Sequence, residues 1–325
     1  MMAYRNLLTI LLILWIAGCA TAPIEFHNDS PPQSVPIAPL INKKEIVIGV
    51  ALGGGATRGF AHIGVLNILE ENGITPDIVV GTSAGAVTGV LYSGGIRGAR
   101  LTEVAQQLQR DQIIDWSYSG RGFIRGDLLQ DYINNLLGNR LIDDFATVFA
   151  ATATDLENGH LVIFTKGDAG LAIRASSAIP GLVSPVTING RDYVDGGLVS
   201  KIPVHVAREL GADIVIAVDV SRTPKDHLDL NNTLSVMKQA IAIMSQAVIE
   251  KDLIDADVVI RPEIGAEPFG NFDSKDQVMN AGERAAIMAL PEIKQLLNQQ
   301  SRFGQSNHRS DQDSTSPQRL APSLD

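Results

Sequence analysis

Three observations predict an α/β fold of three layers, with a mostly parallel central sheet and helices on both faces. Short apolar runs alternate along the chain with longer stretches of helical periodicity, which is typical of a doubly wound sheet. Several runs are continuously apolar and β-branched, as strands buried on both faces of a parallel sheet are. The pattern covers residues 44–300, and about 260 residues fit one large domain. The expected strands are 46–52, 77–81, 148–153, 161–165, 213–220 and 256–261.

Helices are expected where apolar residues recur at helical spacing. In one of these stretches, 232–253, a face packed on the core explains the apolar stripe Met237, Ile241, Met244 and Val248. A further helix is expected to begin after Pro203. The expected helices are 60–71, 101–110, 128–137, 232–253 and 275–297.

A glycine-rich loop, Gly53-Gly54-Gly55-Ala56-Thr57-Arg58-Gly59, follows the first expected strand. Because glycines have no Cβ, the N–H groups of such a loop can point into one space and hold an anion. A P-loop would end in Gly-Lys-Ser/Thr, which this loop lacks. A dinucleotide fingerprint read from Gly53 would need Gly or Ala where Arg58 stands, and the acid expected at the end of the second strand is missing. Both nucleotide-binding interpretations are therefore disfavoured.

The second expected strand ends in Gly81-Thr82-Ser83-Ala84-Gly85 and is followed by a helical stretch of small residues. This is the layout of a nucleophile elbow, in which a serine lies on a tight turn between strand and helix. Gly81 and Gly85 avoid crowding there, and the helix N-terminus favours negative charge developing near Ser83. Alone, the pattern also fits an ordinary Gly/Ser-rich helix start.

A third segment, Tyr193-Val194-Asp195-Gly196-Gly197, ends a strand-like run. An aspartate followed by two glycines is often a plain turn. Together with the glycine loop and Ser83, however, Asp195 supplies the base that an activated serine requires.

These three segments, in this order, resemble the patatin-like phospholipase family, in particular bacterial single-domain members akin to the catalytic domain of neuropathy target esterase. The stretches 58–66, 153–156 and 172–181 are similar as well. The resemblance is dense from 46 to 203 and looser to 298. One departure is Ala56, which stands where many relatives have glycine; its N–H is kept, so oxyanion binding survives unless the position needs a positive φ.

The resemblance implies a patatin-like α/β/α fold and a serine acyl-ester hydrolase, of the phospholipase A or lysophospholipase type, that uses a Ser–Asp dyad. Ser83 would attack the ester carbonyl while Asp195, in its Asp-Gly196-Gly197 motif, takes the proton. The amides of Gly54, Gly55 and Ala56 would hold the oxyanion, with Arg58 shaping or charging the loop. The alternative is a catalytically weak envelope scaffold that uses the same pocket to bind lipid. Neither cofactor nor metal is expected.

A Ser…Asp…His triad is a mechanistic alternative, because in α/β-hydrolases the histidine follows the acid. The candidates are His205, ten residues past Asp195, His227 in an expected surface loop, and His308 in a polar tail. The earlier His62 and His160 have no metal-ligand spacing with another His or Cys. Residues 111–125 hold several apolar side chains among glycines and charges, and they either line an acyl-chain channel, form a flap or belong to the core.

The N-terminus predicts a lipoprotein signal peptide over residues 1–18. Arg5 precedes the largely apolar run 7–16, which is too short to span a bilayer but long enough for a signal-peptide core. The sequence Ile16-Ala17-Gly18-Cys19 resembles a bacterial lipobox, with processing before Cys19 and attachment of acyl chains such as palmitate. Cys19 is the single cysteine of the chain. An ordinary signal peptide with a chance cysteine is the alternative.

Residues 19–43, rich in Pro, Ser and Asn, are expected to form a tether from the lipid-anchored Cys19, and 301–325 a disordered polar tail. Ala20, rather than Asp, directly after the cysteine resembles the pattern for outer-membrane sorting in Gram-negative bacteria. We therefore expect a location in the bacterial envelope, at the outer membrane facing the periplasm. The net charge is −10, and loss of Arg5 with the signal peptide makes it −11. Such an acidic chain disfavours nucleic acid as a partner. The partners expected are the acyl-ester lipid substrate that the resemblance implies and, through the lipidated Cys19, the membrane.

Overall fold

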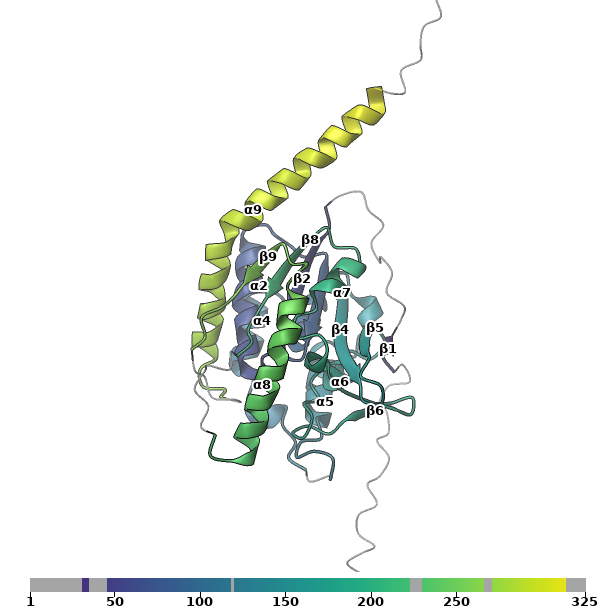
Figure 1. The fold of residues 1–325 in the computed structure, drawn as a ribbon, viewed down its shortest axis with the longest axis vertical. Helices are drawn as coiled ribbons and strands as arrows, with labels where there is room; N and C mark the ends of the chain where they lie inside the picture. Colours follow the sequence, from purple (N-terminus) through teal and green to yellow (C-terminus); the bar gives the residue numbers. More distant parts are fainter. Residues whose placement is uncertain (1–30, 35–45, 118–119, 223–229, 266–270, 314–325) are drawn as a thin grey trace, which may run out of the picture.

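The computed structural model describes residues 31–34, 46–117, 120–222, 230–265 and 271–313. Over these residues nine strands form one sheet, with the order β1-β5-β4-β3-β2-β8-β9 and with β7 and β6 branching from β4. The sheet is enclosed by helices (Figure 1). This confirms the three-layer α/β fold that the alternation of strands and helices predicts.

The parallel part of the sheet holds five strands, and its centre is buried. They are β4 (Val148–Asp155), β3 (Ile78–Thr82), β2 (Ile48–Leu52), β8 (Ile214–Val218) and β9 (Val258–Ile260), each parallel to the next. Every residue of β3 and β8 is buried. Continuous apolar runs were therefore a reliable signal for these strands.

The other edge of the sheet is antiparallel, so the sheet is mixed rather than mostly parallel. β5 (Leu161–Lys166) and β7 (Arg191–Asp195) both pair antiparallel with β4, and β6 (Val186–Ile188) pairs with β7. The two-residue β1 (Gln33–Ser34), inside the expected tether, pairs with β5. Short turns join β4 to β5 and β6 to β7, which permits antiparallel pairing, whereas parallel neighbours need a long crossover.

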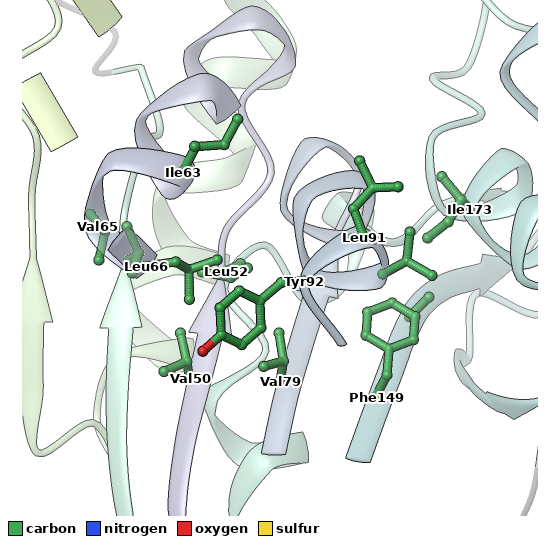
Figure 2. Packing of buried hydrophobic residues seen from close by; sticks show 14 of the residues in the cluster. Val50, Leu52, Ile63, Val65, Leu66, Val79, Leu91, Tyr92, Phe149 and Ile173 are labelled. Carbon is green, nitrogen blue, oxygen red and sulfur yellow. The ribbon is translucent and has the colours of Figure 1, made fainter. Parts of the chain in front are cut away.

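Alternate strand residues enter two separate cores, one on each face of the sheet. Val50 and Val79 belong to the larger core, while their neighbours Ala51 and Val80 belong to the smaller one. Figure 2 shows Val50, Leu52 and Val79 near Leu66 and Tyr92 of the covering helices.

The larger core is covered by α2 (Ala61–Glu71), α3 (Ala84–Ser93), α4 (Gly98–Gln107), α5 (Asp127–Leu136), α6 (Ala169–Ser176) and α9 (Lys275–Asp313). On the smaller core lie α7 (Val204–Glu209) and the C-terminal part of α8 (Thr233–Asp252). Short 3₁₀ turns complete the fold at Ala56–Phe60, Arg110–Gln112, Ile142–Asp144 and Gly196–Leu198.

Two expectations about helices differ from the structure. The stripe on α8 is not a core face, because Met244 is 72% exposed and, among the described side chains of α8, those that contact a core lie at its C-terminal end. The last helix does not end near 297: α9 continues to Asp313 through Pro291, and its end extends away from the domain (Figure 1). Residues 301–313 are therefore helical where a disordered tail was expected. The rest of that tail, 314–325, lies outside the described residues.

Candidate active site

Ser83 lies on a strained turn between β3 and α3. Its φ is +53° and its ψ −120°, a conformation that residues with a side chain rarely adopt. A Cβ at Gly85 would lie 2.0 Å from the Leu52 oxygen, and one at Gly81 would lie 2.4 Å from Ala86 Cα. The two glycines are therefore required for the close approach of β3, α3 and β2, and the Ser83 amide is held by the Ser176 hydroxyl at 2.9 Å.

Asp195 lies at the end of β7, beside Ala153 of β4. Its carboxylate Oδ1 accepts a hydrogen bond of 2.7 Å from the Gly197 amide, and the Ser83 hydroxyl lies near enough to favour the ionised form of the carboxylate. Its own carbonyl accepts a hydrogen bond from Thr154 Oγ1 at 2.9 Å. The antiparallel strand thus brings together two residues that are 112 positions apart in the sequence.

Burial dominates the electrostatics of this carboxylate. Asp195 is only 6% exposed, and burial raises the pKa of its carboxyl above the usual value. The charge of Lys201, the Ser83 hydroxyl and the Gly197 amide each act in the opposite direction. A carboxyl with a raised pKa beside a serine hydroxyl, next to a cavity, is typical of a general base.

Only part of the glycine loop is free to hold an anion. The Gly53 amide donates to the Val218 carbonyl and the Gly54 amide to the Lys201 carbonyl, both at 3.0 Å. The N–H of Gly54, a predicted oxyanion donor, is therefore already used within the fold. For the N–H groups of Gly55 and Ala56, no acceptor is found among the described residues.

Ala56 occupies the left-handed region, with φ +51°. This is the condition under which alanine in place of glycine carries a cost, because its Cβ crowds the backbone there. The position nevertheless starts the 3₁₀ turn Ala56–Phe60 and lines the cavity described below. The loop keeps its shape at the cost of local strain.

Arg58 shapes the loop and does not face the serine. Its guanidinium donates to the carbonyls of Val220 at 2.8 Å, Gly265 at 2.8 Å and Ser221 at 3.3 Å, and the residue is 8% exposed. These bonds join the glycine loop to the segments that follow β8 and β9. Of the two roles that the sequence suggested for Arg58, shaping the loop matches this geometry.

His62 is buried behind the glycine loop, where its Nε2 is 2.8 Å from the Gly53 carbonyl. Burial lowers the pKa of its imidazole to about 4, so the ring is neutral at pH 7 and Nε2 donates the hydrogen bond. Its Nδ1 is buried with no hydrogen-bond partner among the described residues. The sequence alone gave no sign of this support, because a histidine on an apolar helix face is usually a core residue.

Of the histidine alternatives, only His205 has a described side chain, and it does not line the cavity beside Ser83. His205, on α7, has its Nδ1 3.9 Å from the buried Asp252 carboxylate. Among the described residues that line the cavity beside Ser83, none is a histidine. His160 lies in an exposed turn, His227 is outside the described residues, and the side chain of His308 is not described.

An apolar cavity of about 230 Å³ opens beside Ser83. Its walls come from the glycine loop, α3, α4, α5 and the segments 113–126 and 177–183. Apart from Ser83 and Arg174, its polar lining residues are Thr57, Thr88, Tyr132 and Ser177, and the rest are glycine or apolar side chains. Such a shape suits a hydrocarbon chain whose reacting group lies at the serine.

The segment 111–125 divides between the cavity and the surface. Ile113, Ile114 and Ile124 line the cavity, whereas Trp116 is 62% and Phe123 51% exposed. Trp116 and Ile124 form an isolated bridge, and Tyr118 lies outside the described residues. Three apolar residues of this segment therefore fit the interpretation as an acyl-chain channel. Of these three, only Ile124 is buried as a core residue would be.

The described residues contain no group of three or more His, Cys, Asp or Glu side chains that could hold a metal ion. None of the helices in this part of the chain combines the length and the apolar character needed to cross a bilayer. Cys19 lies outside the described residues.

The fold and the strained serine beside a buried carboxylate define an α/β protein with a site of the nucleophile-elbow type. Residues 50–208 match the model of the patatin-like phospholipase family, and the chain contains a domain of this family. A solved structure, VipD from Legionella pneumophila, has a similar fold, with a TM-score of 0.52 and 14% identity over 88% of this chain and 73% of that one.

Curated relatives match the same region. A protein named as an uncharacterized NTE family protein of Mycobacterium tuberculosis is 36% identical over 180 residues, which cover 54% of this chain and 49% of the relative. Lysophospholipase NTE1 of Yarrowia lipolytica is 35% identical over 53% of this chain and 12% of its own length. The patatin-like phospholipase domain-containing protein 7 of Rattus norvegicus is 33% identical over 57% of this chain and 14% of its own length. The chain thus spans half or less of the length of these relatives.

Proposed function

We propose that this protein is a serine acyl-ester hydrolase that cleaves phospholipids or lysophospholipids through a Ser83–Asp195 dyad. The observation that carries the proposal is the Ser83 hydroxyl beside a buried, hydrogen-bonded Asp195 carboxylate at an apolar cavity. The match to the patatin-like phospholipase family and the name lysophospholipase carried by one relative support the same class of reaction.

In the proposed mechanism, Asp195 takes the proton of the Ser83 hydroxyl as Ser83 attacks the ester carbonyl. The amides of Gly55 and Ala56 stabilise the oxyanion, because they have no acceptor among the described residues and stand at the start of the Ala56–Phe60 turn. Collapse of the tetrahedral intermediate transfers the proton to the leaving alcohol and leaves an acyl-Ser83 ester. Asp195 then takes a proton from a water molecule as its oxygen attacks the acyl carbon, and it returns this proton to the Ser83 oxygen when the ester bond breaks and the fatty acid leaves.

The cavity supports a long acyl chain as the recognised part of the substrate. Its lining includes Leu91, Leu101, Val104 and Leu108, all buried side chains of α3 and α4 or its end. Burying apolar surface contributes about 25 cal/mol per Å², so a hydrocarbon chain gains affinity along such a wall. The acyl group would thus bind in the cavity with its carbonyl carbon at Ser83.

The proposal is tested by measuring fatty-acid release from 1-acyl-lysophosphatidylcholine by mass spectrometry. We expect turnover by the wild type and its loss in Ser83→Ala. Ser93→Ala is the matched control, since this buried serine ends the same helix and its hydroxyl has no partner among the described residues. A folded wild type without turnover, or equal turnover in Ser83→Ala, would contradict the proposal, and the lipid-binding scaffold would then account for the cavity.

We also propose that Cys19 carries the lipid anchor and that the domain works at the periplasmic face of an outer membrane. The lipobox-like Ile16-Ala17-Gly18-Cys19 supports this, and several acyl chains on one residue hold a protein to a bilayer firmly. The test is incorporation of labelled palmitate in a Gram-negative host, which Cys19→Ser should abolish. Equal incorporation in the variant would contradict the assignment.

A further inference from the structure

Lys201 follows the Asp195-Gly196-Gly197 turn, and its backbone is fixed from two sides. Its carbonyl accepts the hydrogen bond of 3.0 Å from the Gly54 amide. The buried carboxylate of Asp252, on α8, accepts a hydrogen bond of 2.8 Å from the amide of the following residue, Ile202. It also interacts with the backbone amide of Lys201 itself. The position of the Lys201 Cα relative to the glycine loop is therefore well determined.

The side chain of Lys201 turns back into the active site. A Cβ at Gly197 would lie 3.3 Å from the Lys201 Nζ and 3.0 Å from the Asp195 Oδ1. A Cβ at Gly54 would lie 3.5 Å from the same Nζ and 3.4 Å from the Ser83 Cβ. The two glycines thus leave the space in which the ammonium lies, between the base and the nucleophile.

The other groups around Asp195 are neutral. The elbow presents the Ser83 hydroxyl, β4 presents Thr152 and Thr154, and the turn presents the Gly197 amide. Among the described residues, Lys201 is the cation that acts on this carboxylate, and its ammonium has no hydrogen bond or ion pair there. Both charged groups lie against the same point beside Gly197, and at such close range an opposite charge favours an ionised carboxylate.

We propose that Lys201 is a positioning residue of the hydrolase, whose ammonium keeps Asp195 ionised and thus able to act as the base. This inference rests on the function proposed above and adds a residue to it. A buried carboxylate without a counter-charge would hold a proton at neutral pH, and a protonated Asp195 cannot accept the Ser83 proton. Burial of Asp195 excludes water from the site but disfavours the ionised carboxylate. The Lys201 ammonium offsets this effect, so the carboxylate can be both buried and ionised.

The test compares Lys201→Met with wild type, with Lys201→Arg as the conservative variant and Lys166→Met, an exposed lysine on β5, as the charge-matched control. Two readouts are followed against pH: hydrolysis of p-nitrophenyl butyrate, which lacks phosphate, and the ¹³Cγ signal of Asp195, assigned with Asp195→Asn. In Lys201→Met we expect the acid limb of the pH–rate profile and the midpoint of the Asp195 NMR titration to move up by about one pH unit. The rate on the acid limb then falls about tenfold, while Lys201→Arg and Lys166→Met stay near the wild type.

Unchanged profiles in Lys201→Met would overturn the inference. So would a loss confined to lysophosphatidylcholine with no change on the phosphate-free ester, because Lys201 would then bind the phosphate. Failure of the proposed function is distinguishable, since it appears as an inactive wild type. The NMR midpoint reports the effect of Lys201 on Asp195 even in that case.

Discussion

The amide of Gly54 donates a hydrogen bond of 3.0 Å to the carbonyl of Lys201, and this bond joins the glycine loop to the turn that carries Asp195. The loop that would hold the oxyanion is therefore connected directly to the segment that follows the base. The same bond uses an N–H that the sequence had suggested for the oxyanion. Gly55 and Ala56 are left as the donors in the proposed mechanism.

The strain at Ala56 predicts that Ala56→Gly stabilises the protein. An L-residue in the left-handed region costs about 1–2 kcal/mol, and the flexibility that glycine adds to the unfolded chain offsets about half of this. We expect the free energy of unfolding in urea to rise by about 0.5–1 kcal/mol, with turnover retained because the N–H is kept. Ala56→Val is the contrasting variant, since a β-branched residue at φ +51° should lower both stability and turnover. A destabilised Ala56→Gly would contradict this explanation.

The buried Asp195 predicts a conflict between activity and stability. Burial raises the pKa of this carboxyl, so the folded state binds its proton more tightly than the unfolded state does. The resulting stability is present at acid pH and is lost as pH rises through the folded-state pKa. Asp195→Asn should therefore abolish turnover and yet raise the free energy of unfolding at pH 8 by about 0.5–2 kcal/mol, with a smaller gain at pH 4. Equal effects at the two pH values would argue against an ionised, buried carboxylate.

His62 predicts a loss of stability in weak acid. Burial lowers the pKa of this imidazole to about 4, so between that value and 6.5 the unfolded state binds the proton and the folded state does not. Stability should fall by up to about 3 kcal/mol as pH drops through this window. In His62→Gln, which keeps a donor for the Gly53 carbonyl, the urea midpoint should depend less on pH between 6.5 and 4. An identical pH dependence would show that His62 does not titrate as inferred.

The cavity wall predicts how acyl-chain length can be altered. Ala105 is a buried residue of α4 that lines the cavity, and phenylalanine at this position would fill part of it. For Ala105→Phe we expect kcat/KM on long-chain lysophospholipid to fall about tenfold or more while a butyrate ester is still cleaved. Gln107→Phe, on an exposed position of the same helix, serves as the control. A uniform loss on both substrates would place the acyl chain elsewhere.

The buried parallel strands and the positions of Ser83 and Asp195 could be predicted from local patterns, because continuous apolar runs and glycine-bounded turns are encoded by adjacent residues. The pairing of the antiparallel strand β1 with β5 and the exposure of Met244 depend on distant partners, which local periodicity does not report. The same holds for the engaged Gly54 amide and for Lys201, whose place in the site arises only when the turn after β7 meets the glycine loop.

The central claim is that Asp195 activates Ser83. We would treat the purified protein with a fluorophosphonate ester and map the adduct by peptide mass spectrometry, beside Ser83→Ala, Asp195→Asn and Ser93→Ala. The account predicts one adduct, on Ser83, that is absent from Ser83→Ala, sharply reduced in Asp195→Asn and unchanged in Ser93→Ala. A folded wild type that forms no adduct, or an adduct on another residue that persists in Ser83→Ala, would contradict it.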